Sequence, residues 1–318
     1  MQERITYIDS AKGIGILLVI MGHTVFPLHE AISVFHMPLF FFIGGLTLKM
    51  CSDFTDYTVK KINRIFIPYL FFSIFWAVFD FILPLPVGSD GPLWFLPTMF
   101  STLLFCQILL SVNKKWFLCS ALTFCIANTF LFNHYNLTLL PFDLDRVFRA
   151  TPYMLLGYTF TNTHLNERIL NTNKLFALLW FACFSIIYSA GLYLMIRLEM
   201  IKEGEGFMRG EPYGSSIFLI YIVSFSAIIA TILFSKSISN VIFINWLGKN
   251  SLVILCVHYP FTQFWNTFIS STTLYESIAG RLVCALISYL IIVIFCIPLI
   301  CFCKKFIPKL TGYFPLLG

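Results

Sequence analysis

Three residues near the start of the chain have types and spacing that could support group-transfer chemistry: Lys12, His23 and His36. A neutral imidazole can take a proton near neutral pH, and a lysine can hold an anionic group. The eleven residues from Lys12 to His23 make about three helical turns plus ~20°, so on a helix both share one face, about 16 Å apart. Asp9 lies three residues before Lys12 and is close enough on a helix to pair with it.

The spacing around a predicted turn at Pro27–Glu30 places His36 at the depth of His23. His23 lies four residues before Pro27 and His36 six residues after Glu30, so antiparallel helices would bring the two imidazoles together. This pattern predicts a pair of catalytic histidines. In the alternative interpretation, each histidine donates to a carbonyl of the bundle and has no chemical role. His258, which precedes Tyr259-Pro260, is interpreted as structural.

Composition shows what kind of element must position these side chains. Of 318 residues, 58% are hydrophobic and 11% charged, and the mean hydropathy is +0.85. Soluble proteins carry about 25% charged residues, so this composition excludes a soluble enzyme and a disordered protein. The net charge of +6 comes from scattered Lys and Arg without a basic patch, so we expect no nucleic-acid partner. The chain is predicted to be an integral membrane protein.

Ten apolar segments approach or exceed the roughly 20 residues that a membrane-spanning helix needs. They are Gly13–His29, Ala31–Leu48, Ile65–Pro84, Gly91–Asn113, Trp116–Phe142, Val147–Thr163, Leu175–Ile196, Pro212–Ser235, Asn250–Tyr275 and Leu282–Cys303. The polar–apolar alternation of β-barrel strands is absent from the sequence. We therefore expect an all-α, polytopic membrane helix bundle of about ten helices that forms one domain over residues 1–318. Ser237–Gly248 is too short to span and is interpreted as an interfacial segment.

The ten cysteines fall almost all within apolar segments, where a thiol behaves as a small hydrophobic group. Cys301 and Cys303 are separated by one residue, but no second ligand pair accompanies them. We therefore expect no metal site.

Several motifs resemble the acyltransferase-3 family of membrane acyltransferases, and within it the branch labelled fucose 4-O-acetylase-like. Lys12-x10-His23 is similar to the family's first-helix pattern of Arg or Lys, ten residues and His. It is followed by Phe-His-Met-Pro-Leu-Phe-Phe-Phe at residues 35–42. Lys61-x-x-Arg64 resembles a cytoplasmic Arg-x-x-Arg motif, with Lys in place of the first Arg.

Later segments extend the resemblance over the whole chain. Leu93-Trp94-Phe95-Leu96 resembles the start of the family's fourth helix, and residues 247–258 resemble its late Gly-x-x-Ser-Leu…His signature. One departure is Gly44, where relatives often have Ser.

The resemblance implies transfer of an acyl group, usually acetyl from acetyl-CoA, to a hydroxyl of a saccharide or a lipid-linked glycan. A base must take the proton of that hydroxyl, and His23 and His36 are the candidate catalytic residues. Coenzyme A is polyanionic and cytoplasmic, so Lys12, Lys61 and Arg64, together with Lys60, are candidates for binding it. The sequence leaves open whether the acyl group passes directly or through a covalent intermediate.

Two polar regions could bind the acceptor. The first is the charged segment at residues 197–212, for which a solvated connector is an equal alternative. The second comprises Asp143, Asp145, Arg146 and Arg149, which are expected to pair with one another.

Two other functions are compatible with a multi-span chain: a transporter or flippase of a glycan or lipid, and a non-enzymatic scaffold. Transporters often show repeat-related halves and interrupted helices, and neither pattern is found in this sequence. A scaffold has no use for a histidine pair above a cationic stripe. The sequence therefore favours the acyltransferase.

The distribution of basic residues predicts the orientation and generates a test. With ten spans, the 21 Lys and Arg divide into 15 on the side of both termini and 6 on the other, so the termini should face the cytoplasm across the plasma (inner) membrane. Reporter fusions after Gly318 and within residues 204–210 should report opposite sides. The same side for both would contradict the ten-helix topology.

Overall fold

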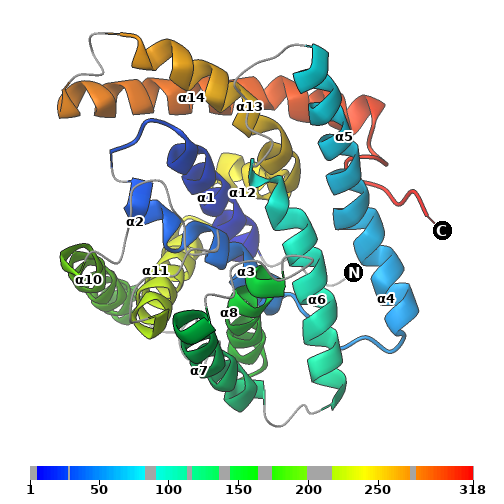
Figure 1. Cartoon of the computed structure of the whole chain (residues 1–318), viewed down its shortest axis with the longest axis vertical. Helices are drawn as coiled ribbons and strands as arrows, with labels where there is room; N and C mark the ends of the chain where they lie inside the picture. Colours follow the sequence, from blue (N-terminus) through cyan, green and yellow to red (C-terminus); the bar gives the residue numbers. More distant parts are fainter. Residues whose placement is uncertain are drawn as a thin grey trace. The chain divides into compact units, whose positions relative to one another are not determined.

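The computed structural model describes residues 6–27, 29–82, 91–112, 117–135, 144–163, 174–198, 217–272 and 277–317. Every regular element in these ranges is a helix, which confirms the all-α prediction (Figure 1). The elements are α1 Thr6–His23, α2 His29–Ser33, α3 His36–Leu46, α4 Phe54–Lys61, the π-helix η1 Ile62–Phe66, α5 Ile67–Ile82, the 3-10 helix η2 Pro92–Trp94, α6 Phe95–Val112, α7 Phe117–Tyr135, α8 Leu144–Asn162, α10 Lys174–Arg197, α11 Ile217–Ser237, α12 Ile242–Lys249, α13 Ser251–Ser270 and α14 Ile278–Phe306.

Six helical segments within the described ranges are long and apolar enough to cross a membrane. They are His29–Leu46, Phe54–Ile82, Pro92–Val112, Leu175–Arg197, Phe218–Ser237 and Ile278–Phe306. The other predicted segments also fold as helices, namely α1, α7, α8 and α13. The protein is therefore a multi-pass membrane helix bundle, and the count of ten spans stays a prediction.

The chain separates into two compact units, each built from three stretches of sequence. Unit 1 comprises Met1–Gly15, Glu30–Met50 and Ser101–Gly248, and unit 2 comprises Ile16–His29, Cys51–Phe100 and Lys249–Gly318. Helix α1 contributes its first part to unit 1 and its last part to unit 2. That residues 1–318 form one domain stays a prediction.

In unit 1, α3 packs closely along α8, and α10 packs along α11 (Figure 1). Two glycines permit the first of these contacts. A Cβ on Gly45 would collide with the Met154 carbonyl of α8, and a Cβ on Gly157 would collide with the Phe42 carbonyl of α3. Small residues allow helix backbones to approach closely where lipid supplies no hydrophobic driving force.

The start of α1 crosses α12 in the same unit. A Cβ on Gly13 would meet the carbonyl of Ile244, and the Ser10 hydroxyl donates to Asn245 Oδ1 at 2.6 Å. Helix α12 has eight residues, so this region is too short to span, as its sequence predicts. Its interfacial position stays a prediction.

The predicted continuous helix at Ala31–Leu48 is wrong in one respect, because α2 ends at Ser33 and α3 begins at His36. A break frees backbone carbonyls, and in a membrane these need partners from the protein. The Tyr188 hydroxyl donates to the Ala31 carbonyl at 2.6 Å, and the Ser224 hydroxyl donates to the Val34 carbonyl at 2.8 Å. Side chains of α10 and α11 therefore stabilise the interruption.

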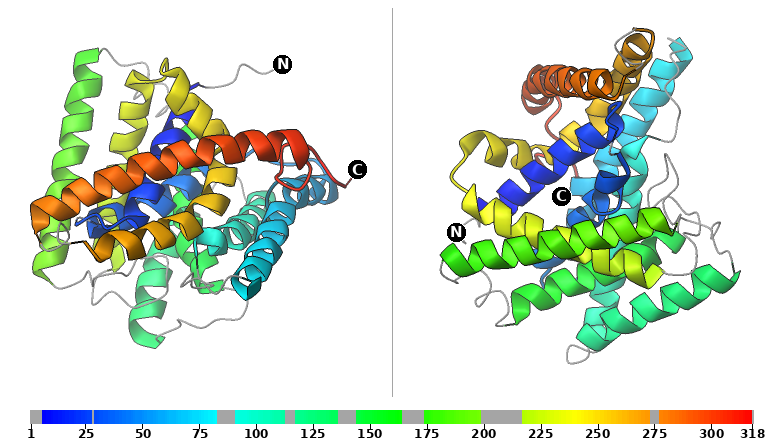
Figure 2. Two further views of the ribbon diagram at one scale, coloured as in Figure 1. Left: turned by 90° about the horizontal axis from the view of Figure 1, so that it is seen from above. Right: turned by 90° about the vertical axis from the view of Figure 1, so that its left-hand side faces the viewer.

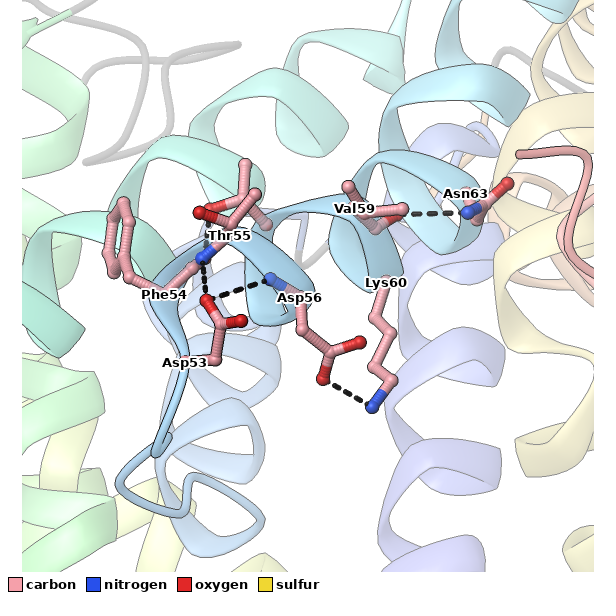
Figure 3. Close-up of polar contacts among 8 residues, drawn as sticks. Asp53, Phe54, Thr55, Asp56, Val59, Lys60 and Asn63 are labelled. Carbon is pink, nitrogen blue, oxygen red and sulfur yellow. Dashed lines mark hydrogen bonds and ion pairs between the residues drawn. The ribbon is translucent and has the colours of Figure 1, made fainter. Parts of the chain in front are cut away.

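In unit 2, helix forms well before the predicted apolar segment at Ile65. Helix α4 begins at Phe54 because Asp53 caps it: Asp53 Oδ1 accepts from the amides of Thr55 at 2.7 Å and Asp56 at 3.3 Å (Figure 3). Helix α14 packs along α13 (Figure 2), and the Trp76 indole of α5 donates to the Cys256 carbonyl of α13 at 2.9 Å.

Candidate active site

The last residue of α1 carries its imidazole into contact with two rings of α13. The His23 and His258 ring centroids are 5.4 Å apart with an interplanar angle of 40°. The Tyr259 ring meets His23 edge-on, at 5.0 Å and 80°. All three residues belong to unit 2. Two ring contacts restrict the orientation of His23, as a catalytic base requires.

The backbone of His23 is held as well. The final carbonyls of a helix have no partner within the helix. The Asn266 amide donates to the His23 carbonyl at 2.8 Å, and the Thr24 hydroxyl donates to the Met21 carbonyl at 2.7 Å. Tyr259 and Asn266 are seven residues apart, about two turns, so they share one face of α13. We call His23, His258, Tyr259 and Asn266 the histidine cluster.

The hydrogen bonds of two histidines identify their tautomers. Nδ1 of His258 lies 2.8 Å from the Ile254 carbonyl, and Nδ1 of His36 lies 2.8 Å from the Ile32 carbonyl. A carbonyl can only accept, so in each case Nδ1 carries the proton and Nε2 of the neutral ring carries the lone pair. His36 therefore makes the carbonyl bond of the alternative interpretation, and whether it also has a chemical role stays open.

His36 is buried at the first position of α3, in unit 1, whereas His23 belongs to unit 2. The break between α2 and α3 gives His36 this position, which the sequence does not predict. That His23 and His36 are neighbours stays a prediction, as does the catalytic role of each.

Lys12 and His23 lie on one uninterrupted helix, as their spacing predicts. Eleven helical rises therefore separate them by about 16 Å along α1. Lys12 is half-buried, and Asp9, one turn earlier, is only 5% exposed. The pairing of Asp9 with Lys12 stays a prediction.

The candidate donor-binding cations of unit 2 lie at the junction of α4 and η1. Lys60 Nζ pairs with Asp56 Oδ2 at 2.6 Å on the surface (Figure 3), and Lys61 Nζ lies 5.0 Å from the Tyr57 ring centroid. Arg64 is exposed within η1. A role for Lys61 and Arg64 in binding an anionic donor stays a prediction.

Asn63, between these two cations, binds the C-terminal segment, which we define as Thr311–Leu317. Its Oδ1 accepts from the amides of Leu316 and Leu317, both at 2.7 Å. Its Nδ2 donates to the Leu317 carbonyl at 3.1 Å and to the Val59 carbonyl at 3.0 Å (Figure 3). One buried side chain therefore joins the π-helix to the C-terminal segment.

A second contact fixes the same segment. The Tyr313 hydroxyl donates to Asn250 Oδ1 at 2.6 Å, and Lys304 Nζ lies 5.2 Å from the Tyr313 ring. Burial raises the pKa of the Tyr313 phenol above its usual range, so the phenol stays protonated at neutral pH and can act as the donor.

The two predicted acceptor regions differ in what the structure describes. Residues 199–212 of the charged segment lie outside the described residues, as does Asp143. Asp145 and Arg149 are both buried within α8. Their pairing, and a role in acceptor binding, stay predictions.

The sequence does not predict the contacts of the histidine cluster. The interpretation of His258 as structural stays a prediction. A signal was present, because three polar residues at positions 258, 262 and 266 recur every fourth position along an apolar helix. The contacts of His258 and Asn266 with His23 join residues more than 230 positions apart and depend on tertiary packing.

Comparison with known proteins identifies the family. A sequence model of the acyltransferase-3 family, described as an acyltransferase domain, matches residues 5–303. The chain belongs to this acyltransferase family. The match favours an enzyme over the transporter and scaffold alternatives. The same range contains the histidine cluster, Lys12, His36, Lys61 and Arg64.

One curated relative is the nodulation protein NolL of Sinorhizobium fredii (strain NBRC 101917 / NGR234). It is 27% identical in the aligned region, which covers 56% of this chain and 54% of the relative. The chain thus spans about half the length of this curated relative. No solved structure matches the chain.

The contacts of Asn63 generate a prediction about stability. Asn63→Ala removes four hydrogen bonds, each contributing about 1 kcal/mol, so we expect the unfolding free energy to fall by about 2–4 kcal/mol and the C-terminal segment to detach. Thermal denaturation in detergent and hydrogen exchange at residues 311–317 measure both effects. Thr58→Ala, which loses one hydrogen bond within α4, is the control. Equal melting temperatures for the two variants would contradict a stabilising role for the hydrogen bonds of Asn63.

Proposed function

We propose that this membrane acyltransferase moves an acetyl group from cytoplasmic acetyl-CoA to a hydroxyl of a cell-surface or lipid-linked saccharide. The observation that carries the proposal is the immobilised His23 at the end of α1, with its ring held by two aromatic neighbours and its carbonyl held by Asn266. The enzyme would act as one ten-helix domain in the plasma (inner) membrane, with both termini in the cytoplasm.

In direct transfer, His23 takes the proton of the acceptor hydroxyl as its oxygen attacks the thioester carbonyl. A carbon–oxygen bond forms and the carbon–sulfur bond breaks. The proton then passes from His23 to the sulfur, which leaves as coenzyme A thiol. His36 is the second proposed catalytic residue and supports this proton transfer from α3.

The donor carries several phosphate charges, so cationic side chains must hold it. Lys61 and Arg64 lie on consecutive elements in unit 2, and Arg64 is exposed to a ligand. Lys12 is the proposed third contact. Its separation of about 16 Å from His23 along α1 is comparable to the reach of an extended pantetheine arm, so phosphates held near Lys12 would deliver the thioester towards His23.

The roles of His23 and Lys12 can be separated by measurement. His23→Ala should lower acetyl transfer by about 10²–10⁴-fold while donor binding is retained, because the base acts on the acceptor. Lys12→Ala should instead weaken donor affinity, and Lys12→Arg should keep much of the activity because either cation binds phosphate. Transfer of labelled acetyl groups in proteoliposomes measures the activity of each variant, and equilibrium binding of acetyl-CoA measures its donor affinity. His29→Ala, a nearby histidine without a proposed role, is the control. Near-normal transfer by well-folded His23→Ala protein would refute the mechanism.

Arg64 provides a separate test of the donor site. Arg64→Glu replaces an attractive charge with a repulsive one, so the dissociation constant of acetyl-CoA should rise about tenfold or more, and less so at high salt. Protein abundance should stay unchanged because the side chain is exposed. Arg281→Glu, at the predicted opposite side of the membrane, is the matched charge reversal. Unaltered donor affinity in Arg64→Glu would remove this residue from the donor site.

A further inference from the structure

Helix α13 carries two buried hydrogen-bond acceptors in the histidine cluster that lack partners among the described residues. They are Nε2 of His258 and Oδ1 of Asn266. His258 is 0% exposed. Their chemical identities are fixed by the bonds that their neighbouring atoms make: Nδ1 of His258 donates to Ile254, and Nδ2 of Asn266 donates to His23. Each remaining atom can therefore accept a hydrogen bond but cannot donate one.

Buried polar atoms without partners are rare in folded proteins, and each such atom calls for an explanation. Near a membrane interior, bulk water does not supply the missing donor. The thioester of the acyl donor offers only acceptor atoms at its reacting end, so it cannot satisfy either position. A hydroxyl group can, because it carries a donor proton. A ligand that carries several hydroxyl groups would therefore satisfy both positions.

We propose that His258 and Asn266 form a hydroxyl-binding subsite that positions the acceptor saccharide beside His23. This proposal rests on the proposed function and names the acceptor as a polyol. Both residues contact His23, one through its ring at 5.4 Å and the other through its carbonyl at 2.8 Å. A saccharide carries several hydroxyls on one rigid ring. One hydroxyl reacts at His23, and others donate to His258 Nε2 and Asn266 Oδ1.

The subsite predicts a particular kind of selectivity. A site that hydrogen-bonds a substrate hydroxyl rejects analogues lacking it, because a buried polar group is then left without its partner. Removal of a hydroxyl that is bound but does not react should therefore lower kcat/KM for the acceptor. The loss should be larger than at a site that selects only by shape or apolar contact. His258 acts here as a positioning residue, since the proton of the reacting hydroxyl goes to His23.

The experiment uses a panel of methyl hexosides and methyl 6-deoxyhexosides as acetyl acceptors. Each is compared with derivatives that lack one hydroxyl at a position that does not react. With wild-type enzyme in proteoliposomes, at least one deoxy derivative should show about a tenfold or greater loss in kcat/KM, mainly through KM. His258→Phe keeps a ring against His23 but lacks the acceptor, so this penalty should disappear while the KM for acetyl-CoA is unchanged. His258→Gln, which can place an amide oxygen near the position of Nε2, should restore part of the discrimination.

Thr267→Val, which changes an exposed residue next to Asn266, is the control and should keep the wild-type selectivity. A deoxy penalty that persists unchanged in His258→Phe and Asn266→Leu overturns the subsite. The subsite is also overturned if these two variants melt at a lower temperature but keep the wild-type KM for the acceptor. That result is expected if a structural water binds these atoms. If His258→Phe does not fold, the wild-type enzyme still tests the proposal. The subsite is overturned if no deoxy derivative shows a loss in kcat/KM. Failure of the wild-type enzyme to acetylate any hydroxyl would instead contradict the proposed function.

Discussion

A polar group inside a lipid bilayer can find a hydrogen-bond partner only within the protein, and this constraint organises both units. Where α2 gives way to α3, hydroxyls from α10 and α11 satisfy the freed carbonyls. Where α1 ends, Asn266 of α13 satisfies the carbonyl of His23. In each case the side chain that repairs a helix end comes from a distant part of the sequence. The bonds that complete the backbone therefore also determine which helices pack together.

The contacts of α13 also restrict the orientation of His23, the proposed catalytic base. An imidazole at a helix end has rotational freedom unless its neighbours restrict it. The rings of His258 and Tyr259 contact His23, and Asn266 bonds its carbonyl. The family match points to acyl transfer, and the contacts of α13 show which side chains adjoin His23. Catalysis by proximity requires such restriction, because each unproductive orientation raises the entropic barrier.

The π-helix η1 links the donor-binding candidates to the end of the chain. A π-turn inserts an extra residue into a helix, and such turns occur frequently at functional sites. Here Asn63 occupies the turn and forms four hydrogen bonds, three of them to the C-terminal segment. The turn is thus stabilised from outside its own helix. Arg64, the next residue, remains exposed to solvent or ligand.

Sequence alone determined the features that depend on local composition and periodicity. The apolar segments predicted the helices, the spacing of Lys12 and His23 placed them on one helix, and the motifs around residues 12–64 indicated the family. Tertiary structure decided the break before His36 and the contact of His258 and Asn266 with His23. Periodicity shows which face of a helix is polar. It does not show which other helix meets that face, because that choice depends on partners hundreds of residues away.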